Sequence, residues 1–241
     1  MALYSIHRVI MTLNRLREDL CRVGQSLYDR GYVHASAGNI SVRLTPGQGG
    51  GFLITPTDAC LGRLDPAQLA HVDEAGVQIS GERASKTLVL HRAIYAASAQ
   101  TGTPAGCIIH THSTHCVSLT LAPEWQSPTE LGPELLPALT PYFVMKVGHV
   151  PCMPYARPGH PEVGPAVART IERYAQAGRP IRAVMLDRLG PNVWHDTPDQ
   201  AMAVLEELEE TAHLWQLSQA RATPLDDADL QALREAFGAV W

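Results

Sequence analysis

The sequence predicts an α/β fold, a single domain over residues 1–241 with a mainly antiparallel central sheet flanked by helices. Three observations predict it. Segments with helical apolar spacing are interspersed with short strand-like segments. These segments do not repeat in the strict strand–helix–strand order of a parallel sheet. The 241 residues fit one large domain, and no linker, repeat or low-complexity segment divides them.

The first half of the chain predicts a helix followed by a hairpin. Residues 9–30 carry apolar side chains three and four positions apart, and Gly31 ends that pattern. Residues 37–44 alternate as a strand does, a glycine-rich loop follows, and residues 52–54 resume a strand. A second pair of short strands near 71–72 and 77–79, and then a helix over 86–99, complete this half.

The second half begins with a buried strand over 105–110 that ends in a histidine. A helix is expected from about Thr114, and the Pro-, Gly- and Glu-rich segment 122–140 reads as a surface excursion. The remaining expected elements are strands at 142–147 and 150–153, a helix at 162–176, strands at 183–186 and 192–194, and helices at 198–219 and 225–237.

Composition excludes several classes of protein. Lys plus Arg is 19 against 24 for Asp plus Glu, a formal charge of −5 without a basic cluster, which argues against nucleic-acid binding. No apolar run approaches the roughly 18 residues of a membrane span, and the first residues do not have the apolar run and small-residue cleavage site expected of a signal peptide. Five widely spaced cysteines without a C-x-x-C pair predict reduced thiols and a cytoplasmic protein.

The charged fraction is also informative. Charged residues make up 18% of the chain, below the usual ~25%. Surface that charge normally covers is therefore expected to lie in a subunit interface, which predicts a homo-oligomer.

The most informative stretch is His110-Thr111-His112. Positions i and i+2 of a strand share a face, so two imidazoles can aim at one point. Divalent metals favour such pairs when further ligands come from elsewhere in the fold. The residues alone leave open a second reading, in which both histidines bond to carbonyls at a strand end.

Five short motifs follow one another in a fixed order. They are residues 36–41 (SAGNIS), 55–57 (TPT), 84–86 (ASK), 110–113 (HTHS) and 190–191 (GP). Together they resemble the class II aldolase/adducin family, which includes fuculose-phosphate aldolase, over roughly residues 12–220. A narrower resemblance, to the 3-oxo-tetronate 4-phosphate decarboxylase branch, lies in residues 60–62, 64–66, 139–148, 150–151, 155–159 and 206–212.

The resemblance implies a metal-dependent carbon–carbon lyase, of decarboxylase or aldolase type, acting on a small phosphorylated keto sugar acid. It implies that His110 and His112 bind a divalent metal: zinc, or manganese, cobalt or iron. It also implies a homotetramer with sites at subunit interfaces. The phosphate is expected at Asn39, Thr57, Ser85 and Lys86, whose small polar groups and backbone amides are sufficient donors.

Tyr142 matches a family tyrosine that reaches a neighbouring subunit's site and transfers a proton. An interface aromatic with a satisfied hydroxyl is the alternative for this residue.

Three positions depart from the family pattern. Leu189 stands where the family has a histidine ligand, and leucine cannot bind a metal. Thr87 stands where the family has a glutamate, and a threonine hydroxyl does not carry a proton near neutral pH as a carboxylate does. Asp58 replaces a glycine and brings a carboxylate near the expected phosphate, where like charges repel. The metal is therefore expected to bind weakly.

Other side chains offer substitutes. Asp187 is the first candidate for a replacement ligand, with a salt-bridged carboxylate beside Arg188 as the alternative. His115 and His91 are further candidates, the first more consistent with capping or packing and the second with a core histidine. Arg63 could neutralise Asp58 as an internal ion pair.

Three functions are compatible with these residues. The first is the metal-dependent lyase, which the histidine pair and the branch resemblance favour. The second is a non-catalytic paralogue that keeps the fold and assembly, which Leu189 and Thr87 favour. The third is a diverged decarboxylase of an unphosphorylated acid, which Asp58 favours.

Overall fold

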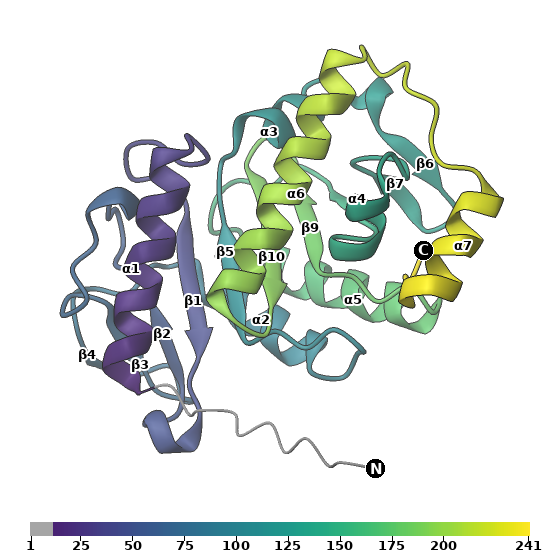
Figure 1. Cartoon of the computed structure of the whole chain (residues 1–241). Coiled ribbons are helices and arrows are strands. Elements are labelled where there is room, and N and C mark those ends of the chain that lie inside the picture. The colour runs from purple at the N-terminus through teal and green to yellow at the C-terminus, as the bar shows by residue number, and fades with distance from the viewer. Residues whose placement is uncertain (1–11) are drawn as a thin grey trace.

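A computed structural model describes residues 12–241 and is built around one eight-stranded sheet (Figure 1). The strand order is β4-β3-β2-β1-β5-β10-β9-β8, and every neighbouring pair is antiparallel except β8 and β9. The predicted fold class is therefore confirmed. The strands are β1 Asn39–Arg43, β2 Phe52–Ile54, β3 Ala70–Val72, β4 Gln78–Ser80, β5 Cys107–His110, β8 Cys152–Met153, β9 Ala183–Leu186 and β10 Gly190–His195.

Helices cover both faces of this sheet. The helices are α1 Leu13–Asp29, α2 Leu88–Ser98, α3 Thr114–Thr120, α4 Pro141–Lys146, α5 Val163–Gln176, α6 Pro198–Leu217 and α7 Asp227–Phe237. Because side chains alternate along a strand, Cys107 and Ile109 of β5 pack in a core with α1, α3, α4 and α6. Ile108 packs in a second core with α2 and α5. His110 shares the face of Ile108, so it points to the α2 and α5 side.

Helix α1 has the N-cap and the apolar face that its sequence pattern predicts. Thr12 caps it by accepting a hydrogen bond from the Arg15 backbone N–H at 3.3 Å. Its buried face carries the apolar residues that the helical spacing selected, including Leu16, Leu20 and Leu27. The part of the predicted helix over residues 9–11 lies outside the described residues.

The predicted strand over residues 142–147 is wrong, because this segment forms α4. Thr140 caps the helix by accepting from the Phe143 backbone N–H at 3.0 Å, and Pro141 occupies its first turn, where a missing N–H costs nothing. The apolar run Phe143–Val144 suits a strand by propensity, but the cap and the proline decide for a helix.

The segment 122–140 is only partly a surface excursion. It forms the hairpin of β6 Ser127–Thr129 and β7 Gly132–Glu134, and then Leu135 and Leu136 are fully buried. The Leu135 backbone N–H donates to the Val150 carbonyl at 2.9 Å, which returns this segment to the core. The predicted strand over 150–153 shortens to the two residues of β8.

Two further predictions concern the cysteines and the absence of a membrane-spanning segment. All five cysteines are free thiols, as predicted. In the described part of the chain, no helix combines the length and the apolarity that crossing a bilayer requires. Short 3₁₀ turns lie at Pro46–Gln48, Leu61–Arg63 and Pro123–Trp125.

Candidate functional site

Three polar side chains form a row across the middle of the sheet. His110 at the end of β5 is in register with Asn39, which begins β1, and with Asn192 of β10. Directly paired residues point to the same face, so all three side chains lie on the α2 and α5 side. All three are buried. Apolar strands thus deliver polar groups to one end of the sheet.

The two predicted metal ligands lie together. The ring centroids of His110 and His112 are 5.1 Å apart. The Nδ1 atom of His110 lies 3.0 Å from the Pro191 carbonyl oxygen and must donate to it, because a carbonyl only accepts. The proton is therefore on Nδ1, and Nε2 keeps its lone pair, which is the form that binds metals.

Electrostatics favour the same state. Burial, with a smaller contribution from the neighbouring His112, lowers the pKa of His110 to about 4. Burial also lowers the pKa of His112, with a second contribution from His34. Both imidazoles are therefore neutral at pH 7, as ligands or hydrogen-bonding groups must be.

The predicted phosphate residues gather beside this pair. The Asn39 Nδ2 atom donates to the Thr87 hydroxyl oxygen at 3.2 Å, and the Ser85 hydroxyl donates to the same oxygen at 3.3 Å. An antiparallel bridge joins the segments that carry Thr57 and Ser85. Thr57 is half-buried, whereas Lys86 is exposed. The structure therefore brings Asn39, Thr57 and Ser85 to one corner, with Lys86 on its solvent side.

Gly190 fixes how closely β10 approaches the histidines. Its φ is +134°, and a Cβ there would lie 1.9 Å from the Thr111 carbonyl oxygen and 3.2 Å from the His112 Cα. Only glycine fits such an approach. Leu189, the preceding residue, consequently lies next to the histidine pair.

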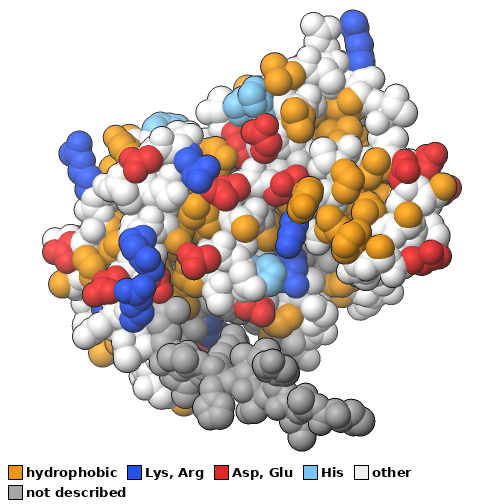
Figure 2. All heavy atoms as spheres, in the orientation of Figure 1, with side chains coloured by type: hydrophobic (Ala, Val, Ile, Leu, Met, Phe, Trp, Pro, Cys, Tyr) orange, Lys and Arg blue, Asp and Glu red, His pale blue; other side chains and the backbone are white. Residues whose placement is uncertain are grey.

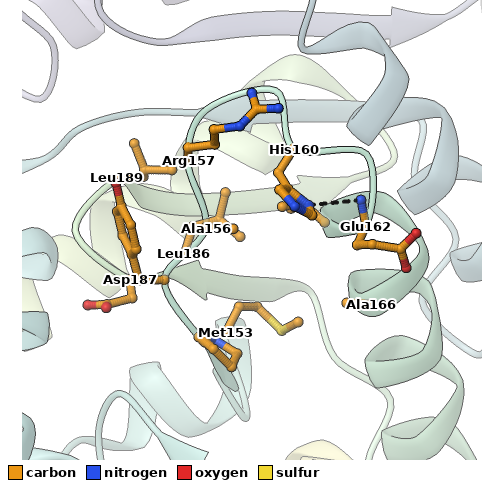
Figure 3. Close-up of a pocket in the computed structure, with 12 residues that line it drawn as sticks. Met153, Ala156, Arg157, His160, Glu162, Ala166, Leu186, Asp187 and Leu189 are labelled. Atoms are coloured by element: carbon orange, nitrogen blue, oxygen red, sulfur yellow. Dashed lines mark hydrogen bonds between the residues drawn. The ribbon is translucent and has the colours of Figure 1, made fainter.

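A cavity of about 430 Å³ has Leu189 in its wall (Figure 3). Its walls come from the end of β8, the turn between β9 and β10, and the start of α5. Arg157, His160 and Asp187 lie among mostly apolar neighbours. The sequence patterns did not predict a binding site at this cavity, although residues 155–159 belong to the resemblance to the 3-oxo-tetronate 4-phosphate decarboxylase branch.

Similarity to known proteins identifies the family of this chain. Residues 18–216 match the Class II Aldolase and Adducin N-terminal domain. The chain belongs to the class II aldolase/adducin family. A 3-oxo-tetronate 4-phosphate decarboxylase of Cupriavidus necator is 49% identical over 235 residues, which are 95% of this chain and 99% of that relative. The protein of the same name in Escherichia coli K12 is 36% identical over 83% of this chain and 85% of its own length.

Solved structures agree with this assignment. YgbL of Klebsiella pneumoniae is 36% identical and has a TM-score of 0.79, with 93% of this chain and 100% of that chain covered. The predicted family and its decarboxylase branch are confirmed, and with them the prediction that the chain is an enzyme.

A metal fits the donors of this family member only partly. The imidazoles of His110 and His112 have the right tautomer and charge for two ligands. Leu189 offers no donor atom, and the Thr87 hydroxyl oxygen already accepts two hydrogen bonds. Within residues 12–241, no group of three or more His, Cys, Asp or Glu side chains could hold a metal ion. The residues present therefore suit a weak, two-ligand site.

The proposed substitute ligands have other partners. Asp187 is half-buried, with an oxygen 3.9 Å from the Arg188 Nε. His115 pairs through Nδ1 with the Glu209 carboxylate at 3.0 Å, which supports the packing role.

His91 is a core histidine. Its Nδ1 lies 2.7 Å from the Ser41 hydroxyl, and it is fully buried. Burial, with a smaller contribution from nearby His110, lowers the pKa of His91 to about 3, and the Asn192 side chain partly opposes this shift. Within the described chain neither the His91 Nε2 atom nor the Asn192 amide has a hydrogen-bond partner of good geometry, so the row on this face keeps unused polar atoms.

The third departure has a conformational explanation. Asp58 has a φ of +59°, in the left-handed region where glycine is favoured and Asp is better tolerated than most residues. Its side chain is exposed. Among the described residues, no ion pair within 4.0 Å joins Asp58 to Arg63, so the suggested neutralisation is not seen.

Tyr142 does not join the other site residues within one chain. It lies on α4, which packs against α6 and α7 on the other face of the sheet, and it is 62% exposed. A role for Tyr142 in this site would therefore require a second copy of the chain.

Proposed function

We propose that this protein is a lyase that decarboxylates a small phosphorylated keto sugar acid. The 49% identity with a 3-oxo-tetronate 4-phosphate decarboxylase, over nearly the full length of both chains, carries this proposal. The site is compatible with it, because the phosphate corner and the histidine pair lie side by side. The single domain over residues 1–241 is taken as the functional unit.

The reaction breaks the bond between the carboxylate carbon and its neighbour. The electron pair moves into the adjacent carbonyl to give an enediolate while CO₂ leaves, and a proton then adds to the carbon. A divalent metal, when bound, would stabilise that oxyanion as a Lewis acid. His110 and His112 would hold it, with zinc as the first choice and manganese, cobalt or iron as alternatives.

The remaining residues have supporting roles in this proposal. Hydroxyl, amide and ammonium groups bind the phosphate, with the Asp58 carboxylate opposing them. Tyr142 of another copy supplies the proton, in a cytoplasmic homotetramer whose sites lie at subunit interfaces. The phosphate-binding groups are those of Asn39, Thr57, Ser85 and Lys86.

The test is CO₂ release from 3-oxo-tetronate 4-phosphate by protein stripped of metal with a chelator and then titrated with zinc, manganese, cobalt or iron. We expect turnover that rises with metal concentration and falls at least about 100-fold in His110→Ala. Arg169→Ala, whose side chain is exposed on α5, is the control and should keep the activity.

A second candidate is a non-catalytic paralogue that keeps the fold. The loss of donor atoms at Leu189 and Thr87 favours it. Absence of both metal uptake and CO₂ release at every metal concentration would establish this alternative and refute the lyase. Turnover of the unphosphorylated acid alone would instead support the diverged decarboxylase that Asp58 suggests.

A further inference from the structure

The cavity beside Leu189 lies at the same end of the sheet as the histidine pair. β5 ends at His110, β10 begins at Gly190, and β8 and β9 end where the cavity begins. Its walls include Leu186 of β9, which belongs to the core on the α2 and α5 side, and Ala166 of α5, which packs against that core. Cavity and histidines therefore share one face and one end of the sheet.

The strand order places the histidine pair between two regions. The phosphate corner is on the β1 side of β5, and the cavity is on the β9 and β8 side. Neighbouring strands lie about 4.8 Å apart, so β5 and β9 are roughly 10 Å apart. A ligand with its phosphate in the corner and its reacting carbon at the histidines would thus direct its other end toward the cavity.

Arg157 and His160 line the cavity among largely apolar side chains, together with the Tyr155 hydroxyl and two carboxylates. The Arg157 guanidinium makes only a long hydrogen bond, 3.5 Å, to the carbonyl of its neighbour Pro158. In the described chain no carboxylate lies within 4.0 Å of it. The His160 Nδ1 accepts from the Glu162 backbone N–H at 3.2 Å, so the proton of the neutral ring is on Nε2.

Two carboxylates also line the cavity but do not occupy its donors. Figure 3 shows the carboxylates of Asp187 and Glu162 pointing in opposite directions, away from His160. Asp187 has Arg188 nearby, at 3.9 Å. Met153, Ala156, Val163 and Leu189 make up much of the remaining wall. An anion here would find an exposed arginine that no carboxylate of the described chain neutralises, and its planar guanidinium can bind a carboxylate through two hydrogen bonds.

We propose that Arg157, assisted by His160, binds the carboxylate of the substrate and so selects a phosphorylated acid over a sugar phosphate that has no carboxylate. This inference rests on the proposed function. A phosphorylated keto acid has two anionic ends, and the phosphate corner holds one cation, Lys86. Arg157 supplies the second, on the opposite side of the histidines.

The chemistry predicts which kinetic constant depends on Arg157. The negative charge of the carboxylate leaves it as CO₂ forms, so an arginine bound to that group stabilises the bound acid more than the transition state. Substitution of Arg157 should therefore raise KM, with kcat unchanged or raised. The apolar wall formed by Leu189 and its neighbours suits the neutral CO₂ that is released.

The test compares two unreactive ligands by calorimetry: 4-phosphoerythronate and erythritol 4-phosphate, which lacks the carboxylate. Wild type is expected to bind the acid at least tenfold more tightly. Arg157→Gln should lose this preference and keep its affinity for erythritol 4-phosphate, whereas Arg157→Lys should keep part of it. Arg169→Gln, an exposed arginine of α5 outside the cavity, is the control.

The outcomes separate the two proposals. An unchanged preference for the acid in Arg157→Gln, or wild type that does not prefer the acid, would overturn the inference. If wild type prefers the acid through Arg157 yet releases no CO₂ from the keto acid, the proposed reaction fails while the carboxylate site stands. Since Arg157 is exposed, its variants should unfold at the wild-type temperature, which a thermal melt checks.

Discussion

Replacing Gly190 by alanine should be among the most damaging small changes in this protein. The new Cβ would lie 1.9 Å from the Thr111 carbonyl oxygen, against 3.4–4 Å for ordinary contact. The φ of +134° adds backbone strain of about 1–3 kcal/mol. Overpacking against rigid backbone costs a further ~1–3 kcal/mol. We therefore expect a loss of about 2–6 kcal/mol in the free energy of unfolding.

Gly178→Ala separates the two contributions. Gly178 also has a positive φ, +76°, but a Cβ there meets nothing within 4 Å. Strain alone should cost about 1 kcal/mol. In a chain of this size each kcal/mol shifts Tm by roughly 2–4 °C, so Gly190→Ala should melt about 4–24 °C lower than wild type.

Circular dichroism during heating and urea titration measure both variants. Relief of the clash would also move His112, so Gly190→Ala should lose activity or metal affinity even where it is folded. Equal stability losses in the two variants would refute the reasoning, because the close approach to Thr111 would then contribute nothing.

Three other predictions follow from the site. Leu189→His combined with Thr87→Glu should tighten zinc binding at least about 100-fold by competition with a chromophoric chelator, and an unchanged affinity would mean that the site has diverged beyond these positions. Asp58→Asn and Asp58→Gly should both bind inorganic phosphate several-fold more tightly in calorimetry, because each removes a carboxylate; equal affinities in all three proteins would place Asp58 away from the anion. The pKa of His91 falls to about 3 in the folded state, below its unfolded value of about 6.5, so the unfolded chain binds an extra proton between these values. Stability should thus be full above pH 6.5 and decline below it, by up to about 1.4 kcal/mol per pH unit from this group, and urea titrations of His91→Asn that keep the wild-type slope would contradict the assignment.

Much of the fold was accessible from local patterns. The helical spacing of α1, α5 and α6 arises from burial of one face, which repeats along the sequence. The strands β5 and β9 are continuous apolar runs because both of their faces are buried. The error at α4 arose where an apolar run satisfies both patterns. Its cap Thr140 and first-turn Pro141 carried the correct signal.

In the candidate site, too, features set by neighbouring residues were predictable, and features set by contacts between distant segments were not. His110 is the last residue of β5 and His112 follows it by two positions, so their proximity was predictable from short-range order. That Asn192 would lie opposite His110, or that Arg157 would stand unpaired beside Leu189, depends on strand register and on where a loop closes. Local sequence does not encode either.

The sequence by itself determined the family, the positions of the histidine pair and the replacement of its third partner by Leu189. These are matters of residue identity and short-range order. Only the tertiary structure decided that Asp58 fills a left-handed position, that Tyr142 lies on the other face from the histidines, and that a cavity with a free arginine adjoins them. The physical reason is that each of these depends on contacts between segments far apart in the chain, where packing selects one arrangement among many that the local pattern permits.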